Sequence, residues 1–108
     1  MNTVPHRLET FSYLPQMTRE QISAQIASIL ERELVPAVEH ATDPGPRTSY
    51  WILWTLPLFD ARTPEAVLAE VDACASANPH AYVRVIGYDA KRGGQAAAFV
   101  VRQPAKTP

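Results

Sequence analysis

An uncharged run at residues 50–59, YWILWTLPLF, limits what this chain can fold into more than any other stretch. Charged residues make up 19% of the chain, yet none occurs in this run, which holds both tryptophans. Aromatic and β-branched residues favour a strand, and Pro57 cannot continue one, so we predict a strand over 50–56. Regular alternation then makes both of its faces apolar, with Tyr50, Ile52, Trp54 and Leu56 on one face and Trp51, Leu53 and Thr55 on the other.

The sequence on either side of this run predicts two helices. The residues TREQ at 18–21 form a capping box, with a threonine N-cap and a glutamine three positions later, and apolar residues follow at helical spacing. Pro36 prevents that helix from continuing. The dipeptide Thr-Pro at 63–64 repeats the start signal for a second helix, which Asn-Pro at 78–79 ends.

Three more strands are expected, at 35–40, 81–88 and 95–102. The loop DAKRGG joins the last two as a hairpin and supplies glycines where positive φ is needed. The order α-β-β-α-β-β predicts a single α+β domain over residues 1–108, with a four-stranded antiparallel or mixed sheet and two helices packed on one face. Residues 1–17 are expected to form an extended arm and residues 103–108 a tail.

The second face of this sheet lacks the polar residues that water would favour. The strand at 81–88 alternates small residues with a larger set, Tyr82, Arg84, Ile86 and Tyr88. Tyrosine and arginine are enriched where proteins bind each other, so we expect Tyr82 and Arg84, together with Tyr50 and Trp54, to face a protein partner. The alternative is that long loops and the N-terminal arm cover this face.

Composition and motif searches exclude several function classes. Ten Lys and Arg against eleven Asp and Glu give a net charge of −1, which argues against nucleic acid or an anionic membrane as a partner. The glycines match no phosphate-binding loop, the three histidines are scattered, and Cys74 lies on the buried stripe of the second helix. We therefore expect no catalytic residue, no bound cofactor and no metal site. The N-terminal sequence has neither signal-peptide nor transit-peptide character, and one cysteine fits a reducing compartment, which predicts a cytoplasmic location.

Several segments, in order and spacing, resemble the small subunit of form I ribulose-1,5-bisphosphate carboxylase/oxygenase (RuBisCO). They are ETFSYLP (9–15), TREQISAQI (18–26), VPAVEH (35–40), YWILWTLPLFD (50–60), VLAEVDAC (67–74) and AYVRVIGYD (81–89). The pairing of ETFSYLP with YWxxWxLPxF is the most specific part of the resemblance. The short loop at 40–49 and the lack of a long extension after residue 102 resemble bacterial members.

The resemblance implies an antiparallel sheet and a non-catalytic role in Calvin-cycle carbon dioxide fixation. It implies assembly of eight large and eight small subunits in the bacterial cytoplasm or a carboxysome, with the magnesium and carbamylated lysine in the large subunit. Residues expected at the interface with the large subunit or with neighbouring small subunits are Glu9, Phe11, Tyr13, Leu14, Pro15, Arg47, Tyr50, Trp51, Trp54, Tyr82 and Arg84. The residues alone leave open a stand-alone α+β ligand-binding or regulatory domain.

Overall fold

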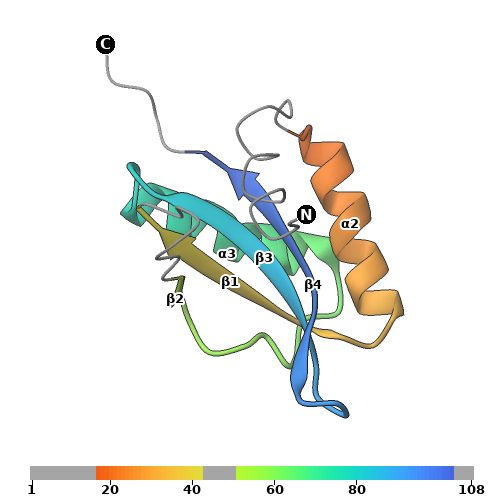
Figure 1. Cartoon of the computed structure of the whole chain (residues 1–108). Coiled ribbons are helices and arrows are strands. Elements are labelled where there is room, and N and C mark those ends of the chain that lie inside the picture. The colour runs from red at the N-terminus through yellow and green to blue at the C-terminus, as the bar shows by residue number, and fades with distance from the viewer. Residues whose placement is uncertain (1–16, 43–50, 104–108) are drawn as a thin grey trace, which may run out of the picture.

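The computed structural model describes residues 17–42 and 51–103 of the chain (Figure 1). Within these residues the elements follow the predicted order of helices and strands. They are α2 (Arg19–Glu31), β1 (Val35–Ala41), β2 (Ile52–Leu53), α3 (Pro64–Ala77), β3 (Tyr82–Asp89) and β4 (Gly94–Arg102). Neither helix has the length and apolar character needed to cross a membrane, as judged over the described ranges.

The capping box predicted for α2 is present. The Thr18 side chain accepts a hydrogen bond from the Gln21 amide at 3.1 Å, and the Gln21 side chain accepts one from the Thr18 amide at 2.9 Å. The helix ends at Arg32 in a Schellman motif, because Leu34 N–H donates to the Ile29 carbonyl and Glu33 N–H to the Leu30 carbonyl. Glu33 has φ +60°, a left-handed conformation that this motif requires and that usually favours glycine.

The sheet is antiparallel throughout, with the strand order β2-β1-β3-β4. β1 and β3 are neighbours although β2 and α3 lie between them in sequence, and their register pairs Glu39 with Arg84. β3 and β4 form the predicted hairpin. Its loop is held by the Asp89 carboxylate, which accepts hydrogen bonds from the Lys91 and Arg92 amides, and by Gly93, whose φ is +71°.

Both helices pack on one face of the sheet, as predicted, and α3 passes behind the long strands in Figure 1. β3 alternates small and large residues, and the small residues point toward the helices. Two of them, Val83 and Val85, are fully buried. The core joins three isoleucines of α2 to the apolar stripe of α3 and to the inner residues of β1 and β3. Gly87 allows α2 to approach closely, because a Cβ there would lie 3.3 Å from the Ile29 side chain of α2 and 3.0 Å from Leu34 Cδ1 just after the helix.

The strand predicted at 50–56 was too long, since β2 comprises only Ile52–Leu53. Trp54 N–H still donates to the Val38 carbonyl, but the next donor to β1 is Leu58 N–H, which reaches the Pro36 carbonyl at 2.8 Å. In a regular antiparallel ladder the N–H of residue 56 would make this hydrogen bond. The segment between Trp54 and Leu58 therefore contains two extra residues that do not pair with β1. Neither Pro36 nor Pro57 has a backbone N–H, so neither can donate a hydrogen bond to the other strand. Pairing is therefore weaker on both strands.

Candidate functional site

A compact cluster of charged and aromatic side chains lies on the face of the sheet that the helices leave uncovered. Glu39 of β1 and Arg84 of β3 are direct cross-strand partners. Arg84 Nε donates to Glu39 Oε1 at 2.7 Å, and Nη2 lies 2.7 Å from the same oxygen. The guanidinium carbon is 4.3 Å from the centre of the Trp51 ring. We call Glu39, Arg84 and Trp51 the outer-face cluster.

The outer-face cluster is largely withdrawn from solvent. The Arg84 and Glu39 side chains are 18% and 15% exposed, although neither helix covers this face. A short, charge-assisted hydrogen bond at this exposure is stronger than a surface ion pair, and the Trp51 ring adds a cation–π contact. The cluster therefore combines an aromatic ring with an arginine whose charge is neutralised, and tryptophan and arginine are residue types enriched at protein contact surfaces.

The structure brings together some of the residues predicted from the sequence for the partner-facing side. Arg84 and Trp51 are in contact, and Tyr82 lies half-buried on the same face, opposite Ala41 of β1. Apart from Trp54, the remaining predicted interface residues lie outside the described ranges: Glu9, Phe11, Tyr13, Leu14, Pro15, Arg47 and Tyr50.

The prediction that Trp54 faces outward was wrong. Its indole Nε1 donates to Glu70 of α3 at 3.1 Å, and its ring meets the His40 ring edge-on at a centroid distance of 6.3 Å. Trp54 also packs against the core cluster. The physical reason is register: residues opposite β1 alternate, so the face that holds Val38 and His40 takes Trp54, whereas Trp51 turns to the face of Glu39.

A second surface was missed by the sequence reasoning. Large apolar side chains are exposed along β2 and the loop after it, and we call this set the edge strip: Ile52 (58% exposed), Leu53 (39%), Leu56 (78%) and Phe59 (67%). Strict alternation had placed Ile52 and Leu56 beside Trp54 on one strand face. The signal that could have found the strip is the pair Pro36 and Pro57, which together interrupt the ladder at this edge.

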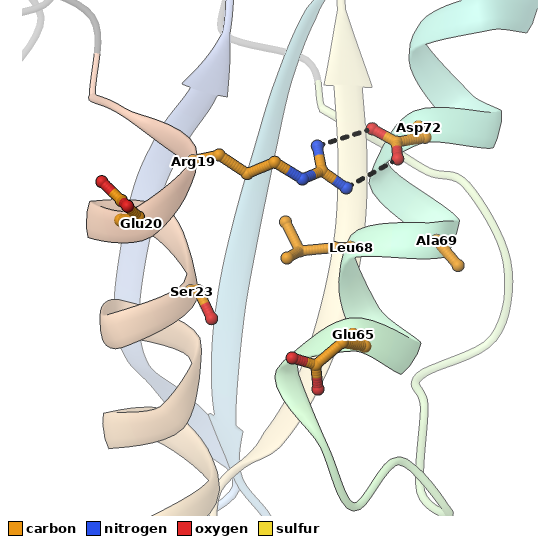
Figure 2. Close-up of a pocket in the computed structure, with 7 residues that line it drawn as sticks. All are labelled: Arg19, Glu20, Ser23, Glu65, Leu68, Ala69 and Asp72. Atoms are coloured by element: carbon orange, nitrogen blue, oxygen red, sulfur yellow. Dashed lines mark hydrogen bonds and ion pairs between the residues drawn. The ribbon is translucent and has the colours of Figure 1, made fainter.

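An open groove of about 580 Å³ runs between α2 and α3 (Figure 2). Arg19 of α2 reaches across to Asp72 of α3, with Nη2 2.9 Å from Oδ2 and Nη1 3.3 Å from Oδ1. This contact raises the pKa of the Arg19 guanidinium above its ordinary value. Leu68 lines the groove between Asp72 and Glu65. Both side chains of the ion pair are more than half exposed. The groove therefore contains a solvent-exposed ion pair that links the two helices, and no reactive group.

Neither a metal-ligand cluster nor an activated cysteine is found in the part of the chain that the structure describes. Within 17–42 and 51–103, no three His, Cys, Asp or Glu side chains come close enough to hold a metal ion. Cys74 is fully buried, and desolvation raises the pKa of its thiol, which disfavours the nucleophilic thiolate.

The chain is similar to known proteins in both sequence and structure. A family model described as "Ribulose bisphosphate carboxylase, small chain" matches residues 8–104. A ribulose bisphosphate carboxylase small subunit from Synechocystis sp. is 44% identical over 106 residues, covering 96% of this chain and 94% of the relative. A small subunit from Hydrogenovibrio crunogenus is 48% identical, covering 90% and 84%. The solved structure of RuBisCO from Galdieria partita superposes with a TM-score of 0.80 at 40% identity, covering 92% of this chain and 73% of that one.

Proposed function

Since this chain belongs to the family of ribulose bisphosphate carboxylase small chains, we propose that it binds a large subunit through the sheet face away from α2 and α3 and supports carboxylation without touching the substrate. The chain is the non-catalytic small subunit of the carboxylase, and its place in carbon dioxide fixation follows from that family. The observation that carries the proposed mode of binding is the outer-face cluster, in which a nearly buried ion pair and Trp51 lie on the sheet face away from α2 and α3.

Eight large and eight small subunits form the proposed assembly. In it the large subunit holds the active-site magnesium and carbamylated lysine, and the small chain binds no cofactor of its own. The bacterial relatives from Synechocystis and Hydrogenovibrio support a bacterial cytoplasmic setting, with packaging in a carboxysome as a further proposal.

A subunit that holds no catalytic group can still change a reaction rate. If the small chain binds one arrangement of the large subunits more tightly than another, it shifts the population toward that arrangement by the difference in binding free energy. Rigid contact surfaces do this best, because little conformational entropy is lost on binding. The outer-face cluster meets that condition, since Arg84 is fixed by the Glu39 carboxylate on one side and the Trp51 ring on the other.

Co-expression with a form I large subunit tests the proposal. We expect the chain to co-purify in one particle whose mass, measured by size exclusion with light scattering, corresponds to equal numbers of both subunits. The carboxylation rate per large subunit should exceed that of large subunits expressed alone. A chain that elutes alone, or a particle with unchanged turnover, would refute the proposal. The alternative of a stand-alone ligand-binding domain predicts a monomer that ignores the large subunit.

A further inference from the structure

The segment after Trp54 holds two leucines that can pair with the same position of β1. Trp54 is fixed at the start of this segment, because its N–H donates to the Val38 carbonyl at 2.8 Å and its indole Nε1 to Glu70 of α3 at 3.1 Å. The next hydrogen bond to β1 comes from Leu58 N–H, which reaches the Pro36 carbonyl. A regular ladder would reach that carbonyl from Leu56, so the two leucines are alternative donors to one acceptor.

The same two leucines are alternative occupants of one core position. Side chains alternate along a strand with a period of two, so a shift by two residues leaves each side chain on its own face of the sheet. Leu58 packs against the core, whereas Leu56 is 78% exposed. In a shifted register Leu56 would lie where Leu58 lies now, and Leu58 would be displaced toward solvent. A leucine fills the core position in both cases.

Pro57 is compatible with the shifted register. The pairing of β2 with β1, if continued, brings Pro57 opposite Val35. Because Pro36 and Val38 supply the carbonyls that bond this segment, Val35 directs its own backbone groups to β3. A residue opposite Val35 therefore has its backbone nitrogen on the outer side of β2. β2 is an edge strand, and such an outward-facing position is where an edge strand tolerates proline.

Local hydrogen bonds favour the observed register. Ala61 N–H donates to the Leu58 carbonyl at 3.2 Å, and Phe59 N–H donates to the Pro57 carbonyl at 3.0 Å. The shift breaks both of these turn contacts, each of modest net strength, and keeps one hydrogen bond to the Pro36 carbonyl. It also lengthens the loop before α3 by two residues, which costs little because loop-closure entropy grows slowly with length. The two registers are therefore close in free energy, and the shifted one is the minor state.

We propose that residues 55–59 exchange between these two registers, with Trp54 as the fixed point. The observed register displays Leu56 and Phe59 and holds Leu58 against the core. The shifted register places Leu56 in the core and displays Leu58. A partner that contacts one of these surfaces favours the register that displays it, in proportion to its difference in affinity for the two. The exchange arises within this chain and does not depend on the proposed function.

A pair of asparagine substitutions tests the exchange in the full chain. Leu56→Asn changes an exposed side chain, so by itself it should leave the urea midpoint nearly unchanged. Leu58→Asn should lower the midpoint only slightly, because Leu56 then fills the core position. The double variant has no leucine for that position, so its midpoint should lie about 1 M below that of Leu58→Asn. The exchange is refuted if Leu56→Asn has no effect in the Leu58→Asn background. If the double variant does not fold, alanine at both positions gives the same comparison with a milder loss.

Thiol labelling gives a second readout, whose sign differs from that of simple destabilisation. Cys74 is the chain's single cysteine and is fully buried, so in Leu58→Cys the introduced thiol is the one expected to react with a maleimide under native conditions. The smaller side chain favours the shifted register, in which residue 58 is displayed. Adding Leu56→Asn returns residue 58 to the core position. Labelling should then slow about tenfold, if the shifted register falls from most of the molecules to about a tenth of them.

The matched control for this measurement is Ile52→Asn. Ile52 is also exposed but precedes Trp54, so its replacement should leave the labelling of Leu58→Cys unchanged. A loss of stability opens the chain and speeds labelling, so slower labelling reports the change of register alone. Labelling that stays equal or becomes faster when Leu56→Asn is added would overturn the proposal.

Discussion

Replacing Arg84 with methionine tests how much the outer-face cluster contributes to the fold. The variant leaves the Glu39 carboxylate without its partner at 15% exposure and removes the cation from the Trp51 ring. Breaking a fully buried pair costs about 3–5 kcal/mol, and a hydrogen bond to a charged group contributes about 1.5–3 kcal/mol. Because the pair keeps some contact with solvent, we expect a loss of about 2 kcal/mol in the free energy of unfolding.

Urea unfolding of the purified chain, followed by circular dichroism, measures this loss. With a urea dependence of about 1–3 kcal/mol per M, the midpoint should fall by about 1 M. Arg92→Met is the matched control. Arg92 is 89% exposed and its nitrogen lies 3.8 Å from Asp89, so its removal should leave the midpoint unchanged within error.

A double-mutant cycle separates the pair from the rest of the site. Glu39→Met combined with Arg84→Met removes both charges together, so the double variant should cost at least about 1 kcal/mol less than the sum of the single variants. Additive effects, or a loss below about 0.5 kcal/mol for Arg84→Met, would refute the view that these residues act as one coupled and partly buried unit.

Three further predictions concern the scaffold. Glu33→Gly should raise the free energy of unfolding by about 0.5–1 kcal/mol, because it relieves the strain of a left-handed conformation and removes a carboxylate beside the C-terminus of α2. An unchanged urea midpoint would contradict this. Gly87→Ala should cost about 1–3 kcal/mol in the same assay, since its Cβ would lie 3.0 Å from Leu34 and 3.3 Å from Ile29, and a neutral result would mean that α2 moves freely. Burial raises the pKa of the Cys74 thiol, so the folded chain keeps a proton that the unfolded chain releases above about pH 8.5. The free energy of unfolding should therefore be independent of this group below that pH and fall above it, and Cys74→Ala should flatten the fall between pH 8 and 9.5.

The fold was predicted from sequence patterns that depend only on residues close together in the chain. The capping box at Thr18 and the threonine before Pro64 define both helix starts because each depends on residues within one turn. The alternation of small and large residues in β3 assigned its helix-facing side correctly, since Val83 and Val85 are buried and Gly87 contacts α2. These features need no information from distant parts of the chain.

The candidate site could be predicted only in part, because it depends on pairing between distant strands. Arg84 was expected at a contact surface, but its partner Glu39 lies 45 positions earlier and was not singled out. Trp51 and Trp54 were correctly predicted to lie on opposite faces of the strand. Which of the two faces meets the helices is fixed by the register of β2 with β1. The interruption of β2 escaped prediction for the same reason, since Pro36 lies across the ladder from the residues that it displaces.

The central claim is that this chain raises carboxylation while contributing no catalytic group. Its most direct test is to titrate the purified chain into small-subunit-free large-subunit octamers, recording the initial rate of ribulose-1,5-bisphosphate carboxylation at each ratio. We expect no turnover by the chain alone, and a rate that rises with added chain and saturates at one small chain per large subunit. Turnover by the rigorously purified chain, or a rate that does not respond to it, would contradict this role.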